Sequence, residues 1–131
     1  MNEIIDYNQK YSLRTKKYAV DIIKFFANHC KKTEELRIIG KQFFRSGTSV
    51  AANFRAYTRG RSVAERYSKM CIVVEEVDET LFWFELIEEA ELIDNSILSS
   101  IKLESLELLK IFSVTKSILK TNYYSFLIPH F

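Results

Sequence analysis

The sequence predicts an all-α protein, and more narrowly a left-handed, antiparallel four-helix bundle with up-down-up-down order. Only three glycines and one proline occur in 131 residues, so the chain lacks the turn residues that a β-sheet needs. Apolar residues instead recur at spacings of three and four over four long stretches, which is typical of helices with a buried face. We expect one domain over residues 1–131, with helices at about 12–31, 34–58, 63–93 and 99–122.

The first two expected helices follow residues that suit a helix start. Ser12 is the candidate N-cap of the first, and residues 1–11 are expected to be a frayed lead-in. Thr33 precedes two glutamates, which the positive end of a helix dipole favours. The middle of the second helix is built of small residues between Arg45 and Arg55, so a neighbouring helix can approach it closely.

The connection between the second and third helices carries the strongest local signal. Gly60 is expected to end the second helix, and Ser62 with Glu65 forms a capping box that opens the third. So short a connection predicts an antiparallel hairpin. The third helix is apolar over a wide face, so we expect it to be central in the bundle or shared with another subunit.

The last part of the chain gives a fourth helix and an apolar tail. Residues 94–96 break the apolar pattern, and Ser99 or Ser100 is expected to cap the helix that follows. Residues 123–131 are too apolar to stay in water, so they either fold back on the bundle or dock on a neighbouring subunit.

Charge is distributed unevenly although the formal net charge is only +2. Residues 1–69 hold 15 Lys and Arg against 6 Asp and Glu. Residues 75–94 hold nine acids and no base. The chain therefore combines a basic half with an acidic helix, and the net charge understates the local field.

The residues needed for catalysis or for a metal site are missing. A di-iron bundle needs Glu-x-x-His on two helices, but the two histidines, His29 and His130, follow Phe26 and Leu127 at that spacing. His29 and Cys30 are adjacent, and neighbours on a helix diverge too far to act as base and nucleophile. Cys30 and Cys71 are expected to be reduced thiols. We expect no enzyme activity and no cofactor.

Nothing in the sequence predicts export or a membrane span. The N-terminal residues Glu3 and Asp6 stand where a signal peptide would be basic, and the longest uncharged run, residues 121–131, is too short to cross a bilayer. We expect a cytoplasmic protein without a membrane partner.

Two groups of basic residues are candidate binding sites. If the hairpin folds at Gly60, Arg45 lies level with Glu75 or Glu76, Lys41 with Glu79 and Arg37 with Glu85. Arg37, Lys41 and Arg45 thus form a secondary basic stripe that its own hairpin or a neighbouring subunit neutralises. The bases at the tip have only Glu65 nearby: Arg55, Arg59, Arg61, Arg66 and Lys69.

The tip bases are the predicted nucleic-acid-binding residues, because the arginine fork matches phosphate oxygens. No exposed aromatic residues alternate with them, so binding should be directed at the backbone and depend strongly on salt. The alternative is a solvated charged tip without a ligand.

Three segments resemble a known family. Residues 45–53 (RSGTSVAAN), Arg61-Ser62 and residues 74–83 (VEEVDETLFW) are similar to the bacterial four-helix-bundle proteins encoded in intervening sequences of large-subunit ribosomal RNA genes. The resemblance covers roughly residues 12–120. Many members have a glutamate three residues after the asparagine, whereas this chain has Ala56 three residues after Asn53.

The resemblance implies a homopentamer. A relative within the family is the accessory protein of diversity-generating retroelements. This relative implies a basic surface that holds RNA or DNA beside a nucleic-acid-processing partner. We therefore expect a non-enzymatic oligomeric scaffold that contacts a nucleic-acid backbone. The alternative is a pure protein-interaction and assembly module with no nucleic-acid role.

Overall fold

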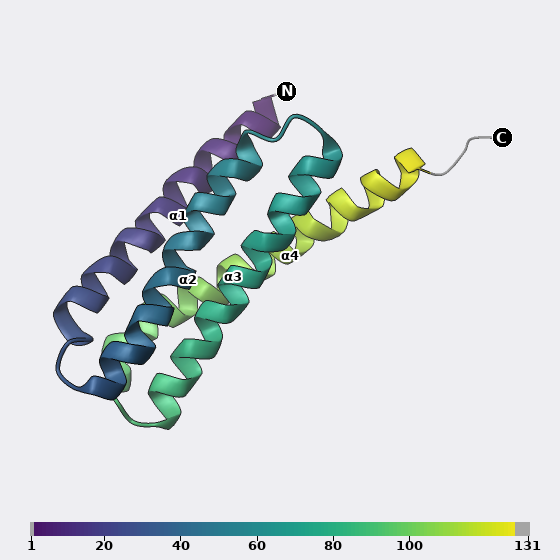
Figure 1. Ribbon diagram of the computed structural model, residues 1–131. Helices are drawn as coiled ribbons and strands as arrows, with labels where there is room; N and C mark the ends of the chain where they lie inside the picture. Colours follow the sequence, from purple (N-terminus) through teal and green to yellow (C-terminus); the bar gives the residue numbers. More distant parts are fainter. Residues whose placement is uncertain (1, 128–131) are drawn as a thin grey trace.

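The computed structural model describes the backbone of residues 2–127 and most of their side chains, and this part is helical apart from short connections (Figure 1). α1 spans Asn2–His29, α2 Glu34–Thr58, α3 Val63–Glu89 and α4 Asn95–Leu127. The described residues include no strand. The predicted all-α four-helix fold is confirmed.

Neighbouring helices run in opposite directions. Gly40 of α2 lies against Cys30 of α1, and Gly47 lies against Ile22, so residue numbers rise on one helix as they fall on the other. α2 contacts α1 and α3, and α4 contacts α3 and α1. α1 and α3 therefore lie on opposite sides of the bundle. In Figure 1, α4 passes behind the other helices and its last turns extend beyond them.

The core follows one face of each helix and a wider face of α3. Four phenylalanines have no more than 1% of their surface exposed and form its centre: Phe43, Phe54, Phe84 and Phe112. The buried residues of α3 are Met70, Val73, Val77, Thr80, Leu81, Phe84 and Ile87. This wide burial agrees with the prediction that α3 is central, because α3 packs on both α2 and α4.

A layer of hydroxyl groups crosses the core, one from each helix. It consists of Tyr18, Ser46, Thr80 and Ser105, none more than 1% exposed. The Tyr18 hydroxyl lies 2.5 Å from Ser105 Oγ, and Thr80 Oγ1 lies 2.9 Å from Ser46 Oγ. Burial raises the pKa of the Tyr18 phenol to about 12, against the opposing effect of its hydrogen bonds to Ser105 and Thr80.

Two of the predicted helix caps are confirmed. Thr33 Oγ1 accepts a hydrogen bond from the Leu36 amide at 3.2 Å. Ser62 Oγ accepts one from the Glu65 amide at 3.1 Å. Each cap satisfies a backbone donor that the first turn of a helix leaves without a partner.

The predicted start of the first helix is wrong. α1 begins at Asn2, and Ser12 lies inside it. The residues expected to fray are held by packing, since the Tyr7 ring lies 6.2 Å from the ring of Phe54. The Tyr7 hydroxyl also lies 2.6 Å from Thr115 Oγ1 on α4. Contacts with other helices, rather than a local cap, extend α1 toward the N-terminus.

The predicted start of the fourth helix is also wrong. α4 begins at Asn95, about one turn before Ser99 and Ser100. Asp94 Oδ1 accepts a hydrogen bond from the Ser96 amide at 2.9 Å and so caps the helix. This hydrogen bond lowers the pKa of the Asp94 carboxyl below its usual value.

α3 ends at Glu89, earlier than the expected residue 93. It ends in a motif that the sequence pattern does not predict. Glu91 has a left-handed backbone with a φ of 54°. Its amide bonds to the Glu88 carbonyl at 3.0 Å, and the Leu92 amide bonds to the Ile87 carbonyl at 3.0 Å. These two bonds make a Schellman ending, with glutamate at the position that glycine usually occupies.

Gly60, by contrast, has no left-handed backbone. Glycine fits here because it has no side chain: a Cβ at this position would lie 2.6 Å from Arg66 Cγ.

The first part of the expected tail continues α4. Residues 123–127 belong to the helix, and the Tyr123 ring stacks on Tyr67 of α3 with centroids 5.9 Å apart. Tyr123 therefore packs on its own bundle, whereas the last turns of α4 extend beyond the other helices (Figure 1). Residues 128–131, including His130, lie outside the described residues.

Candidate nucleic-acid interface

The structure separates the five predicted tip residues. Arg55 and Arg59, one turn apart at the end of α2, line a groove between α1 and α2. Arg61 lies 3.6 Å from Glu65 in the connection to α3. Arg66 donates a hydrogen bond to the Gly60 carbonyl at 3.3 Å. Lys69 is half-buried on α3.

The groove contains a third base that sequence reasoning missed. Lys16 of α1 lines the same groove, which has a volume of about 430 Å³, opposite Arg55 and Arg59. Lys16 lies some forty residues away in sequence, and only the pairing of α1 with α2 brings it to this position. Its exposed position off the apolar stripe of α1 was the one sequence signal that could have suggested it.

Small side chains leave the groove open. Ala51 and Ala52 of α2 and Ser12 of α1 form part of its lining. Further along the same interface, a Cβ on Gly47 would occupy the space of Ile22 Cδ1, so the two helices are close there. The groove therefore has a fixed position beside a tightly packed contact.

No acid neutralises the three bases of the groove. Its lining includes no carboxylate, and no ion pair occurs between Lys16, Arg55 or Arg59 and any described side chain. Arg14, which lies between Leu13 and Lys16 in sequence but contacts α4, shows the opposite arrangement. It forms a two-point contact with Glu104 at 2.7 and 2.9 Å, which raises its pKa further above its already high value.

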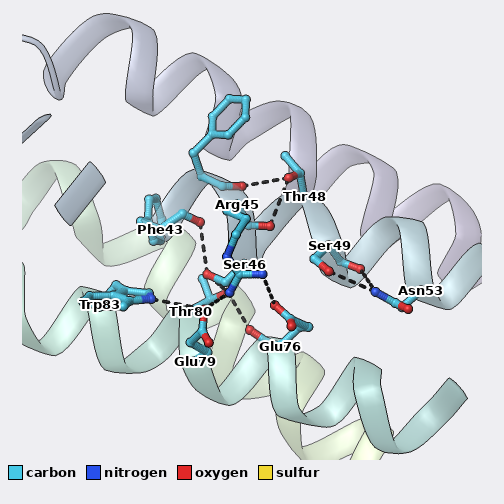
Figure 2. A network of polar contacts seen from close by, with 11 residues as sticks. Phe43, Arg45, Ser46, Thr48, Ser49, Asn53, Glu76, Glu79, Thr80 and Trp83 are labelled. Atoms are coloured by element: carbon cyan, nitrogen blue, oxygen red, sulfur yellow. Dashed lines mark hydrogen bonds and ion pairs between the residues drawn. The ribbon is translucent and has the colours of Figure 1, made fainter. Parts of the chain in front are cut away.

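The secondary basic stripe behaves as predicted only at Arg45. Figure 2 shows Arg45 of α2 directed at two carboxylates of α3, with Nη1 3.4 Å from Glu76 and Nη2 in contact with Glu79. Glu79 also accepts a hydrogen bond from Trp83 Nε1 at 3.3 Å. Burial raises the pKa of Glu76, and the positive charge of Arg45 opposes this shift.

The other two pairings of the stripe are wrong. Arg37 contacts Glu34 on its own helix at 3.5 Å rather than Glu85. Glu79 is held by Arg45 and Trp83, and Lys41 has no ion pair within the described part of the chain. The predicted alignment of α2 with α3 is wrong. A fold at Gly60 would place Ser46 level with Glu75, whereas Ser46 contacts Thr80.

The described residues offer no arrangement for metal or thiol chemistry. No three of their His, Cys, Asp and Glu side chains are placed to hold a metal ion. Cys30 and Cys71 are free cysteines, as expected, and burial raises the pKa of the Cys30 thiol to about 11. Within residues 2–127, no helix has the length and apolar character that crossing a membrane requires.

The fold and the resemblance identify a class of protein, a four-helix bundle with a basic groove. The model of the 23S rRNA-intervening sequence protein family matches residues 8–114, and the chain belongs to this family. A solved structure from the S23 ribosomal protein family of Bacteroides thetaiotaomicron VPI-5482, described as a protein of unknown function, is similar to this chain. It is 32% identical, with a TM-score of 0.72 over 86% of this chain and 97% of that chain. The search of curated proteins gives no match.

Proposed function

We propose that this protein is a non-enzymatic scaffold that binds the phosphate backbone of RNA or DNA at the groove between α1 and α2. The observation that carries the proposal is the set of three bases, Lys16, Arg55 and Arg59, on one concave surface without a carboxylate. Arginine and lysine in such a setting attract phosphate strongly, because no internal ion pair must be broken first. Membership of a family named for ribosomal RNA intervening sequences agrees with a nucleic-acid partner in the cytoplasm.

Oligonucleotide binding across a salt series tests the proposal. We expect Arg55→Gln/Arg59→Gln to weaken binding of a labelled oligonucleotide in fluorescence anisotropy. We also expect the double variant to reduce the slope of log K against log salt by roughly 1.4–1.8, since each lost phosphate contact removes about 0.7–0.9.

Lys31→Gln/Lys32→Gln is the matched control, because it removes the same charge at the other end of the bundle. An absence of binding at low salt would refute the proposal. An equal loss in the control would also refute it, because net charge rather than the groove would then set the affinity.

The scaffold part of the proposal is self-assembly through opposite sides of the bundle. The outer face of α1 beyond the groove carries the exposed residues Val20, Ile23, Lys24 and Ala27. The outer face of α3 carries Glu75, Asp78, Phe82, Glu85 and Glu89, all exposed. Each face has an exposed apolar part, Val20 and Ile23 on α1 and Phe82 on α3, and the two faces differ in the sign of their charge.

These complementary faces fit a second copy of the chain. α1 and α3 lie diagonally across the bundle, so the two faces point away from one another. A surface on one side that binds a different surface of the next copy makes a head-to-tail interface, which closes into a ring or extends into a filament. The number of copies, five by family resemblance, stays a prediction. Self-assembly without oligonucleotide binding would instead favour the pure assembly module.

A further inference from the structure

We infer that the groove between α1 and α2 takes a single strand of nucleic acid, with part of a nucleotide inserted, rather than the outer surface of a duplex. The inference rests on the proposed function and specifies its ligand. Three features of the groove carry it: its concave shape, the apolar part of its lining and the spacing of its arginine side chains.

The shape of the groove suits an inserted group. Its volume of about 430 Å³ falls within the range of roughly 300–1,000 Å³ that small-molecule sites occupy. A duplex keeps its bases stacked inside and presents a convex surface of phosphates, so it would lie across the rim. A single strand can turn a base or a sugar outward and fill the space.

Part of the groove lining is apolar, although phosphate binding alone would not need apolar side chains. Leu13 is 69% exposed and lines the groove together with Ala51 and Ala52. This exposed apolar surface lies beside cations and faces a concave space. The flat, apolar face of a nucleobase would cover it. The phosphates of the strand would then contact the arginine and lysine side chains at the rim.

The spacing of the basic side chains at the rim fits one strand of nucleic acid. Arg55 lies in the last turn of α2 and Arg59 is the C-cap residue four positions later, which places their backbones about 6 Å apart along the helix axis. This spacing is comparable with the distance between consecutive phosphates of one strand. Lys16 faces them from α1 and closes the other side of the groove.

Filling the groove without changing its charge tests the inference. Ala52 is exposed, so Ala52→Phe can place a ring in the groove without entering the core. The measurement is the ratio of affinities for a single-stranded oligonucleotide and for the duplex of the same sequence and length. We expect the unmodified protein to prefer the single strand by about tenfold or more, the effect of one well-placed apolar contact.

In Ala52→Phe we expect this preference to fall to about one, with duplex binding little changed. Leu13→Ser removes an apolar side chain of the lining instead of filling the space and should also reduce the preference. Ser113→Phe adds the same ring at an exposed position of α4, outside the groove, and should keep it. Circular dichroism confirms that each variant is folded.

The outcomes separate this inference from the proposed function. Equal affinity for single strand and duplex in the unmodified protein would overturn the inference and leave a backbone-binding scaffold. A preference that survives Ala52→Phe would also overturn it, because the selectivity would then arise outside the groove. Binding of neither form would overturn both proposals.

Discussion

Gly47 shows how one missing methyl group sets the distance between two helices. A Cβ at this position would occupy the space of Ile22 Cδ1, and it would lie 3.2 Å from Ile22 Cγ2. Ile22 is fully buried and Gly47 is buried, so the Ile22 side chain cannot turn toward solvent to make room for a methyl group. The close approach of α1 and α2 therefore depends on the absence of a side chain at residue 47.

We expect Gly47→Ala to lower the free energy of unfolding by about 1–3 kcal/mol, because overpacking outweighs the better helix propensity of alanine. Urea denaturation measures the change. Ile22→Val removes the conflicting Cδ1 atom, so the double variant should recover part of the loss. If the two effects simply add, α1 and α2 are not in the close contact described.

At the scale of the helical element, the ends of the helices are set by single hydrogen bonds. The Asp94 carboxylate accepts the Ser96 amide, and this bond lowers the pKa of Asp94. Because the folded-state pKa lies below the unfolded value of about 3.9, the cap stabilises the protein fully above that value. The stabilisation disappears as the pH falls through the folded-state pKa.

We expect Asp94→Ala to destabilise the protein at pH 7 and to make progressively less difference below pH 4. Urea titrations of both proteins from pH 7 to pH 2.5 measure this change. Asp6→Ala, which removes an exposed carboxylate from α1, serves as the control. A difference that stays constant down to the lowest pH would show that Asp94 does not act through its charge.

The sequence predicts those elements whose signals are local. Thr33 and Ser62 sit next to the amides that they cap, so their role is visible in a few residues. The true start of α1 is not visible, because packing of Tyr7 on other helices determines it. Part of the candidate site was found for the same local reason, since Arg55 and Arg59 are one turn apart. Lys16 joins them only through the α1–α2 packing.

At the scale of the whole molecule, the basic and acidic faces on opposite sides of the bundle define the expected assembly. Val20 and Ile23 on α1 are 40% and 42% exposed, and Phe82 on α3 is 48% exposed. A head-to-tail interface buries one face of each type, so every copy keeps one free face of the other type until a ring closes. Blocking the two faces separately can distinguish this arrangement from a symmetric dimer.

We expect Val20→Asp/Ile23→Asp and Asp78→Lys/Phe82→Lys each to be monomeric, and their equimolar mixture to form a dimer. Each partner in the mixture retains the face that the other has lost. Sedimentation velocity measures the species. Leu103→Asp/Leu106→Asp, on the exposed side of α4, is the control and should still assemble. A mixture that stays monomeric would contradict the head-to-tail interface.

The hydroxyl layer in the core has a consequence for the surface. Ser46, Thr80 and Ser105 each have a carbonyl partner on their own helix, so they would keep a hydrogen bond if the helices slid. The Tyr18 phenol depends on other helices, and a slip of α1 by one turn would bury it without a partner at a cost of about 1–3 kcal/mol. Lys16 lies two residues before Tyr18, so the anchored phenol also fixes how far along the bundle that surface cation sits.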